Sequence, residues 1–303
     1  MKYIGLDVGG HTITAGAADF SRSPAKLIAA ETVSAPSPRT AEGLVDAAAL
    51  LVTRFAERGE ECFIGMGLPG FVGKDRKTVA RLTNYENCDG FALGDMAERR
   101  LAERGLRAKA AIENDANCAA LGEGMAGEAV GMEDYVVLTL GTGIGAGIVS
   151  GGRLLRGAHG MAAECGHIAL CGAELTGCGC GGAGHLEEAA SADWLERRAK
   201  EAGLPADFKT LWQMRAVPEV NALISPALET LARGVVSITV TLDPEAVILS
   251  GGMSRAEGLA QELAARARKY LPMPFRPYFT LKTSNLGGGA AVIGAASLFA
   301  MPR

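Results

Sequence analysis

The chain opens with an apolar run, YIGLDV at residues 3–8, whose composition predicts a buried strand. Two glycines follow, and residues 12–18 (TITAGAA) resume strand character, so a hairpin turn is predicted at residues 7–11. From Thr40 the period changes, because apolar residues recur at helical spacing as far as Phe55, with Thr40 as the candidate N-cap. The first part of the chain therefore predicts a hairpin followed by a helix.

The patterning continues along the chain and alternates strands with helices. Strands, some with the turns that follow them, are predicted at residues 62–70, 109–115, 135–140, 146–154 and 243–252. Helices are predicted at residues 116–127, 219–241 and 289–300. This alternation predicts an α/β fold of packed layers.

One weak internal repeat indicates how the chain is divided. Residues 6–16 (LDVGGHTITAG) and residues 138–147 (LTLGTGIGAG) both show a strand, a glycine turn and a second strand. Each copy stands at the start of a predicted lobe. Two similar lobes facing one another would form a cleft into which both glycine turns could point.

Composition then narrows the class of protein. A length of 303 residues fits roughly two domains, and 48% apolar with 21% charged residues is ordinary for a globular protein. The net charge of −4 and the lack of a basic run argue against a nucleic-acid partner. No apolar segment approaches the roughly 20 residues of a membrane span, and the N-terminus is too short before its glycines for a signal peptide. A cytoplasmic protein is expected.

Three glycine turns are candidates for binding a phosphorylated ligand, because they expose backbone N–H groups with no Cβ in the way. The candidate residues are Gly9, Gly10 and Thr12 in the first turn, Gly141, Thr142 and Gly143 in the second, and Gly251 and Gly252 in the third. The third turn would approach a base or ribose. Asp7 ends the first strand, where a carboxylate beside phosphate suits Mg²⁺. The alternatives are ordinary hairpins and a turn-forming aspartate; the chain has no Walker pattern.

Asp115 is the candidate catalytic residue. It stands where a predicted strand meets a helix, and phosphoryl transfer to a hydroxyl needs a group that orients the hydroxyl and accepts its proton. Asn114 could hydrogen-bond a neighbouring hydroxyl and so fix which oxygen attacks. The alternative is that Asp115 only caps its helix.

Residues 166–188 concentrate side chains that bind metals. Four of the seven cysteines fall within residues 165–180, which favours reduced thiols around a metal over a disulfide framework. The candidate ligands are His167, Cys178, Cys180 and His185. Such an N₂S₂ set suits Zn²⁺, and four protein ligands predict a structural site. Cys165 and Cys171 could substitute, and the alternative is a loop of buried free thiols.

In their order along the chain, these motifs resemble the ROK family of repressors, open reading frames and sugar kinases. The resemblance covers essentially the whole chain, through GLDVGGHTI, GMGLPG, ENDANCAALGE, LTLGTGIGAGIV, GAHGMAAECGHI, CGCGGAGHLE and LDPEAVILSGG. It implies the two-lobed actin-like ATPase (ribonuclease H-like) fold, with Asp115 as the base. It also implies that Glu164, His167 and Glu187 bind sugar hydroxyls, with His167 shared between sugar and zinc, whereas Glu188 is expected to be ordinary surface charge.

The chain departs from the family pattern at three places. His185 stands where a cysteine is expected, and His11 stands where threonine is usual. The segment after Gly70, a glycine of the implied sugar site, lacks the common Pro-Asn-Leu, so Asn84 is the counterpart of that asparagine. The stretch GLPGFVGKDRKTV most resembles allose kinases within the family.

The implied lobes are residues 1–115 plus 291–303, and residues 116–290 with the zinc loop. The implied activity is transfer of a phosphoryl group from ATP, with Mg²⁺, to the 6-hydroxyl of a hexose. The implied protein is a cytoplasmic homodimer without nucleic-acid or membrane partners. D-Allose is one candidate acceptor, and glucokinase, fructokinase and N-acetylmannosamine kinase are alternatives. A ROK repressor is disfavoured, because the first strand begins near Tyr3 and leaves no room for a helix-turn-helix. A catalytically silent sugar-binding module is the other alternative.

Overall fold

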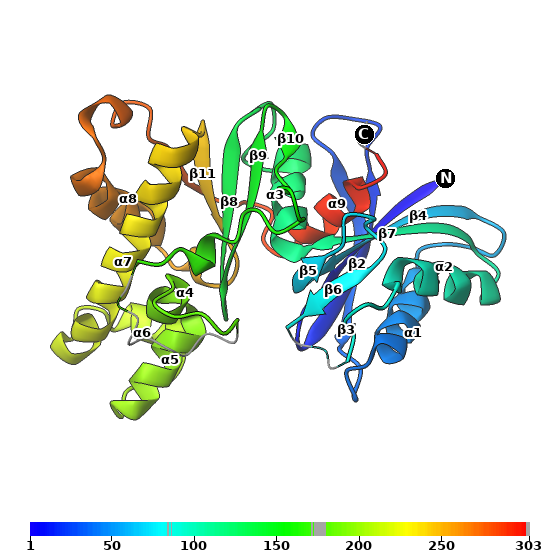
Figure 1. The fold of residues 1–303 in the computed structure, drawn as a ribbon, viewed down its shortest axis with the longest axis horizontal. Coiled ribbons are helices and arrows are strands. Elements are labelled where there is room, and N and C mark those ends of the chain that lie inside the picture. Colours follow the sequence, from blue (N-terminus) through cyan, green and yellow to red (C-terminus); the bar gives the residue numbers. More distant parts are fainter. Residues whose placement is uncertain (84, 86, 171, 173–179, 301–303) are drawn as a thin grey trace. The chain divides into compact units, whose positions relative to one another are not determined.

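The computed structural model of the chain describes residues 1–83, 85, 87–170, 172 and 180–300. The chain forms two compact units (Figure 1). Unit 1 comprises Met1–Gly131, Leu154–Ala162 and Leu286–Arg303, and unit 2 comprises Met132–Arg153 and Ala163–Asn285. Each unit contains one five-stranded sheet with helices around it, so the predicted two-lobed α/β fold of the actin-like type is confirmed.

Unit 1 has the sheet order β3-β2-β1-β4-β7. Its strands are β1 (Lys2–Val8), β2 (Thr12–Asp19), β3 (Lys26–Ser34), β4 (Glu61–Leu68) and β7 (Arg107–Asn114), with a separate hairpin of β5 (Gly70–Val72) and β6 (Val79–Leu82). Its helices are α1 (Ala41–Val52), α2 (Leu93–Glu103), α3 (Asp115–Ala126) and α9 (Gly289–Ser297). The predicted hairpin after β1 is present, and Thr40 caps α1 by accepting a hydrogen bond from the backbone N–H of Gly43.

Alternation along β1 determines which helices cover each face of this sheet. Ile4, Leu6 and Val8 are fully buried in one hydrophobic core with residues of α1 and α2. Gly5 points to the opposite face, where a Cβ would lie 1.8 Å from the carbonyl oxygen of Val292 in α9. Only glycine therefore permits α9 to lie so close to the sheet, and α3 packs on α9 in turn.

Unit 2 repeats this arrangement with the sheet order β10-β9-β8-β11-β12. Its strands are β8 (Tyr135–Leu140), β9 (Ile144–Ser150), β10 (Arg153–Leu154, at the edge of the unit), β11 (Ala246–Ser250) and β12 (Leu281–Thr283). Its helices are α4 (Glu187–Ala190), α5 (Ala192–Glu201), α6 (Phe208–Gln213), α7 (Pro218–Leu242) and α8 (Leu259–Tyr270), with short 3₁₀ turns η1 (Cys165–His167), η2 (Met253–Arg255) and η3 (Met273–Phe275).

The two sheets explain the internal repeat in the sequence. In each, an antiparallel hairpin (β1–β2 or β8–β9) surrounds a glycine turn. In each, the first strand of that hairpin also pairs in parallel with a later strand, β4 or β11. The two copies of the sequence pattern are therefore equivalent elements of the two units.

Helix α7 is the long helix that the sequence predicts at residues 219–241. Among the described residues it is the one helix long and apolar enough to cross a membrane, and half of its most apolar window is buried within the protein. Ile224, Leu228 and Leu231 lie on this buried side, in the core of unit 2. The expectation that no apolar segment approaches span length is therefore wrong for α7, and core packing accounts for its composition.

The division into units differs from the boundaries expected at residues 115 and 290. Helix α3 belongs to unit 1 because it packs along α9. A Cβ on Gly294 of α9 would lie 1.7 Å from the carbonyl oxygen of Cys118 in α3. The two helix backbones are therefore almost in contact, and residues 116–131 remain with the N-terminal sheet.

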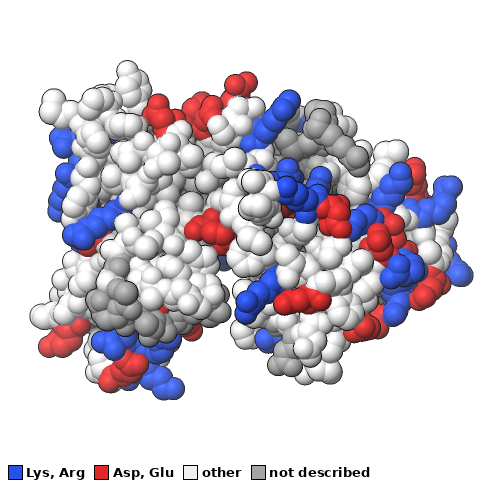
Figure 2. Space-filling model, in the orientation of Figure 1, with Lys and Arg blue, Asp and Glu red and all other residues white. Residues whose placement is uncertain are grey.

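Charged side chains of both signs are interspersed on the face shown in Figure 2. Near α2, Lys77 Nζ lies 3.1 Å from Asp95 Oδ1, and Arg100 Nε lies 3.0 Å from Glu103 Oε2. This mixture of charges is typical of a solvated protein surface.

Candidate functional site

The candidate site in unit 1 lies at the carboxyl end of three neighbouring parallel strands. Strands β1, β4 and β7 pair so that Asp7 is opposite Gly67, and Gly67 is opposite Glu113. Asp115 follows β7 as the first residue of α3. Because ligands of open α/β sheets bind outside the carboxyl ends of the strands, this edge is where a reacting group is expected.

Burial changes the acid–base behaviour of Asp7 and Asp115. Desolvation and, as the smaller cause, the nearby charge of Asp115 together raise the pKa of Asp7 to about 7. Desolvation also raises the pKa of Asp115 to about 6, although its Oδ1 accepts a hydrogen bond from the Ala116 N–H at 2.8 Å. A carboxylate with a pKa near neutrality suits a general base, and two neighbouring carboxylates suit a divalent cation.

Asn114, and not Asp115, is the N-cap of α3. Its side-chain oxygen accepts from the Asn117 N–H at 3.0 Å, and its Nδ2 donates to the carbonyl oxygen of Gly70 at 3.1 Å. The interpretation of Asp115 as the helix cap is therefore wrong. Two predicted sugar-site residues, Gly70 and Asn114, are thus hydrogen-bonded to each other. Another, Asn84, lies outside the described residues.

Glu113 is a buried residue of this site that the sequence analysis missed. It is only 4% exposed. Its Oε1 accepts from the Asn114 N–H at 3.1 Å and from Asn117 Nδ2 at 3.0 Å. Its Oε2 accepts from Arg156 Nε at 2.8 Å. Glu113 thus fixes the junction between β7 and α3 that carries Asp115, but its partner Arg156 is too distant in sequence to reveal the pair.

The first glycine turn joins β1 to β2 as predicted. The Gly9 N–H donates to the Thr12 carbonyl oxygen at 2.8 Å, which closes the turn around Gly10. His11 is exposed, and its carbonyl oxygen accepts from the Ala35 N–H at 2.8 Å. The turn therefore accommodates histidine in place of threonine without loss of its closing hydrogen bond.

The second and third glycine turns lie together in unit 2. The Gly141 N–H donates to the Gly143 carbonyl oxygen at 3.0 Å, and Thr142 at the tip of the turn is exposed. Gly251 has a φ of 85°, and a Cβ there would lie 2.4 Å from the carbonyl oxygen of Leu140, which immediately precedes the second turn. The structure therefore brings Gly251 against the base of the turn at residues 141–143.

A large cavity opens beside the third turn. It measures about 890 Å³, and Gly252, Trp212 and Arg215 are among the residues that line it. A Cβ on Gly252 would meet no atom within 4 Å. The guanidinium of Arg215 stacks over the ring of Trp212, 4.5 Å from its centroid. Such a cavity has the volume and the flat side chains to hold a planar ring.

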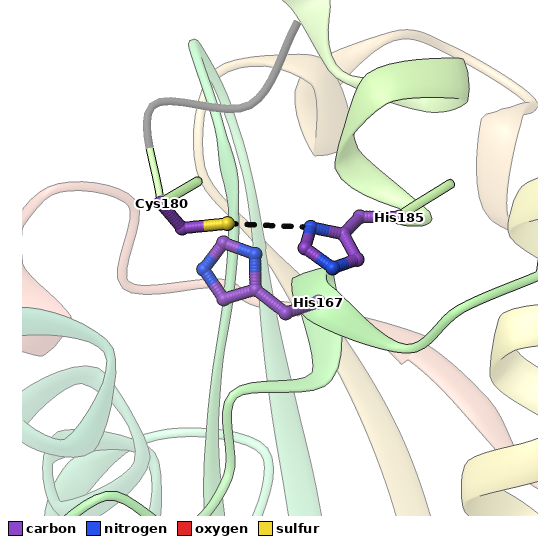
Figure 3. A group of neighbouring side chains, drawn as sticks. All are labelled: His167, Cys180 and His185. Atoms are coloured by element: carbon purple, nitrogen blue, oxygen red, sulfur yellow. Dashed lines mark hydrogen bonds between the residues drawn. The ribbon is translucent and has the colours of Figure 1, made fainter. Parts of the chain in front are cut away.

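Three of the four predicted metal ligands converge in unit 2 (Figure 3). Ligand atoms of His167, Cys180 and His185 all lie within 4.8 Å of one another, and Cys180 Sγ lies 3.5 Å from His185 Nδ1. Zinc bonds of ~2.3 Å to sulfur and ~2.0 Å to nitrogen at tetrahedral angles place these atoms about 3.5 Å apart. The described donors therefore fit Zn²⁺, and Cys178 lies outside the described residues.

Cys165 does not join this cluster. It lies in the hydrophobic core of unit 2, and burial raises the pKa of its thiol to about 11. A thiol is a poor metal ligand unless it loses its proton. Cys171, the other suggested substitute, lies outside the described residues.

The three acidic residues around the cluster have different surroundings. Glu164 Oε2 lies 3.7 Å from His167 Nε2, so two predicted sugar contacts are neighbours. Glu187 Oε2 accepts from the Ile144 N–H at 2.7 Å. Glu188 is only 5% exposed and accepts from the His185 N–H at 3.1 Å. The interpretation of Glu188 as surface charge is therefore wrong, since it supports the backbone of a predicted metal ligand.

The chain is similar to known proteins over nearly its whole length. The model of the ROK family matches residues 3–301. The glucokinase of Thermotoga maritima is 31% identical over 98% of this chain and 97% of its own length. The N-acetyl-D-glucosamine kinase of Vibrio parahaemolyticus is 33% identical over 98% of this chain and 99% of its own. A ROK family glucokinase from Streptomyces griseus, solved with glucose and AMPPNP, gives a TM-score of 0.82 at 31% identity and covers 98% of this chain and 99% of that one.

Proposed function

The chain belongs to the ROK family and is a sugar kinase, and we propose that it transfers the terminal phosphoryl group of ATP to the 6-hydroxyl of a hexose. The observation that carries the proposal is Asp115, a partly buried carboxylate near Asp7. Desolvation raises the pKa of Asp115 to about 6. At neutral pH such a group is ionised yet basic enough to accept a hydroxyl proton. Asp115 would be the general base, and Asn114 and Gly70 would contact the sugar beside it.

The donor side of the proposal rests on the glycine turns and on Asp7. Backbone N–H groups around Gly9, Gly10 and Thr12, and around residues 141–143, would bind the phosphates of ATP. Asp7 would hold Mg²⁺, directly or through water, and the ion would neutralise charge on the phosphates. The cavity beside Gly252, with its stacked tryptophan and arginine, would take the adenosine.

The acceptor side rests on Glu164, His167, Glu187 and the predicted contact Asn84. Carboxylates and imidazole accept hydrogen bonds from the hydroxyl groups of a hexose. The relatives described above are named for glucose and N-acetyl-D-glucosamine, so we propose glucose or an N-acetylhexosamine as the acceptor. These names do not support the closer resemblance to D-allose kinases.

We also propose that His167, Cys178, Cys180 and His185 hold a structural Zn²⁺. The spacing of the three described ligand atoms supports it. The four residues would close the coordination sphere, and the metal would fix the glycine-rich loop that carries the sugar contacts. The homodimer and the cytoplasmic location stay predictions from sequence, which sedimentation and cell fractionation would test.

Release of ADP with a panel of acceptors tests this function. The panel contains glucose, N-acetylglucosamine, N-acetylmannosamine, fructose and allose, each with ATP and with inorganic polyphosphate as donor. Phosphorus NMR of the product then identifies the phosphorylated oxygen. We expect ATP-dependent formation of a 6-phosphate from glucose or an N-acetylhexosamine. No turnover of any acceptor above the rate of ATP hydrolysis would contradict the proposed substrates.

A further inference from the structure

Ile144 lies between the second glycine turn and the loop of the predicted metal ligands. It is the first residue of β9, directly after Gly143, and it is buried. Its N–H donates to Glu187 Oε2 at 2.7 Å. A Cβ on Gly143 would lie 2.3 Å from the same carboxylate oxygen. Glycine at position 143 is therefore required for the Glu187 carboxylate to reach the turn.

The carbonyl group of Ile144 is packed as closely as its N–H group, in this case against Gly166. A Cβ on Gly166 would lie 1.9 Å from the Ile144 carbonyl oxygen, so the backbone of η1 packs directly on this residue. At the start of the turn, the Ala192 N–H donates to the Gly141 carbonyl oxygen at 2.9 Å. Both ends of residues 141–144 are thus bonded to the segment that begins α4 and α5.

The residues that hold Ile144 adjoin the metal-ligand cluster. Gly166 is next to His167, and Glu187 is two residues after His185. All of these contacts lie within unit 2. Movement of the histidine cluster would therefore displace Ile144 and, with it, the backbone N–H groups of the turn.

We propose that Glu187 is a positioning residue for the phosphate-binding turn at residues 141–143. Its carboxylate fixes the Ile144 N–H, and the turn presents its own N–H groups to the donor only while that bond holds. The loop that carries His167, Cys180 and His185 thereby controls binding of the nucleotide as well as of the sugar. This role rests on the proposed phosphate-binding function of the turn and goes beyond a sugar contact by Glu187.

Three substitutions at position 187 separate this role from one that depends on charge. Glu187→Gln removes the charge but keeps an oxygen that can accept from Ile144. Glu187→Asp keeps the charge but withdraws the carboxylate by one methylene, and Glu187→Ala removes the acceptor. Asp193→Asn, at an exposed position in the first turn of α5, is the control for loss of one negative charge.

The measured quantities are the Kd of a non-hydrolysable ATP analogue by calorimetry and the hydrogen exchange of peptides covering residues 140–146. We expect Glu187→Ala and Glu187→Asp to weaken nucleotide binding about 10- to 100-fold, by analogy with the loss of residues that orient metal ligands. Exchange at residues 140–146 should accelerate in both variants. Glu187→Gln and Asp193→Asn should stay near the wild type in both measurements.

Each other outcome has a defined meaning. Failure of the wild type to bind the analogue would refute the proposed donor site and leave nothing for Glu187 to position. Normal nucleotide binding by Glu187→Ala, or weaker binding by Glu187→Gln than by Glu187→Asp, would overturn the positioning role in favour of a charge effect. If Glu187→Ala does not fold, the contrast between the Gln and Asp variants still decides.

Discussion

At the scale of single residues, the chemistry depends on how desolvation shifts the pKa values of Asp7 and Asp115. Both carboxyl groups have a raised pKa, about 7 and about 6, because they have little water around them. For a group whose folded pKa exceeds its unfolded value, the folded state binds the extra proton at acid pH. Protonation of these two groups stabilises the folded state fully below the unfolded pKa near 3.8. This contribution to the free energy of unfolding is lost as the pH rises through 6 to 7.

The pH dependence of activity follows from the ionised form of Asp115. A general base works only when deprotonated, so kcat/KM should rise with pH up to about pH 6 to 7 and then level off. Well below this range we expect about a tenfold loss per pH unit. Initial rates at saturating Mg²⁺ across the acid range measure the profile. A flat profile down to about pH 5 would mean that no carboxylate with a raised pKa is needed.

Asp115→Asn should separate activity from stability. Loss of the base should lower kcat by about 10² to 10⁴, while the sugar still binds. The same change removes a partly buried, desolvated charge. The free energy of unfolding at about pH 8 without Mg²⁺ should therefore increase by ~1 kcal/mol or more, since one pKa unit is worth ~1.4 kcal/mol. Urea unfolding at about pH 8 and about pH 5 measures this, with the gain expected to shrink at the lower pH. A variant that is folded and fully active would disprove the base assignment.

At the scale of elements, the metal loop and the second glycine turn form one assembly. The sequence places them far apart, and on that basis loss of the metal should lower the affinity for the sugar more than the affinity for the nucleotide. The contacts of Ile144 with Gly166 and Glu187 change that expectation. Disturbing the loop should affect both ligands.

Cys180→Ser tests this coupling. We expect zinc, present at about one ion per chain in the wild type, to be reduced or absent in the variant, as measured by elemental analysis. The Kd values of glucose and of the ATP analogue should both rise, by about 10- to 100-fold, with the thermal melt recorded to detect unfolding. A rise for the sugar alone would show that the turn is independent of the metal loop. If the wild-type protein is well folded and active without zinc, the proposed structural zinc site is wrong.

Local sequence patterns predicted the helices and the hairpin well. The features that the sequence did not predict depend on contacts between residues far apart in the chain. The hairpin at Gly9, the Thr40 cap and helices α3 and α7 follow from periodicity and capping, which act over a few residues. The pair of Glu113 and Arg156 joins residues 43 positions apart. Neither residue has a local signal for its partner, because long-range pairing depends on how the sheets pack.

At the scale of the whole molecule, the last helix determines what belongs to unit 1. Helix α9 lies against β1 and β4 on one side and against α3 on the other. A C-terminal segment thus completes the core that holds Asp7 and Asp115. The family resemblance implied that the C-terminus returns to the first lobe, but it placed α3 in the other lobe. The glycines that let α3 and α9 pack closely do not reveal in the sequence which helix is their partner.

Gly294→Ala tests how strongly unit 1 depends on this contact. A Cβ at position 294 would lie 1.7 Å from the Cys118 carbonyl oxygen, which is backbone and can yield only if α9 moves away from α3. Overpacking of this kind costs about 1 to 3 kcal/mol and sometimes more. Gly288→Ala is the matched control, since a Cβ there meets nothing within 4 Å and its φ of −69° suits alanine. We expect calorimetry to show a lower melting temperature and faster hydrogen exchange in α3 for Gly294→Ala only. Equal melting temperatures for the two variants would show that α9 can shift freely, and the close packing would then not be what assigns α3 to unit 1.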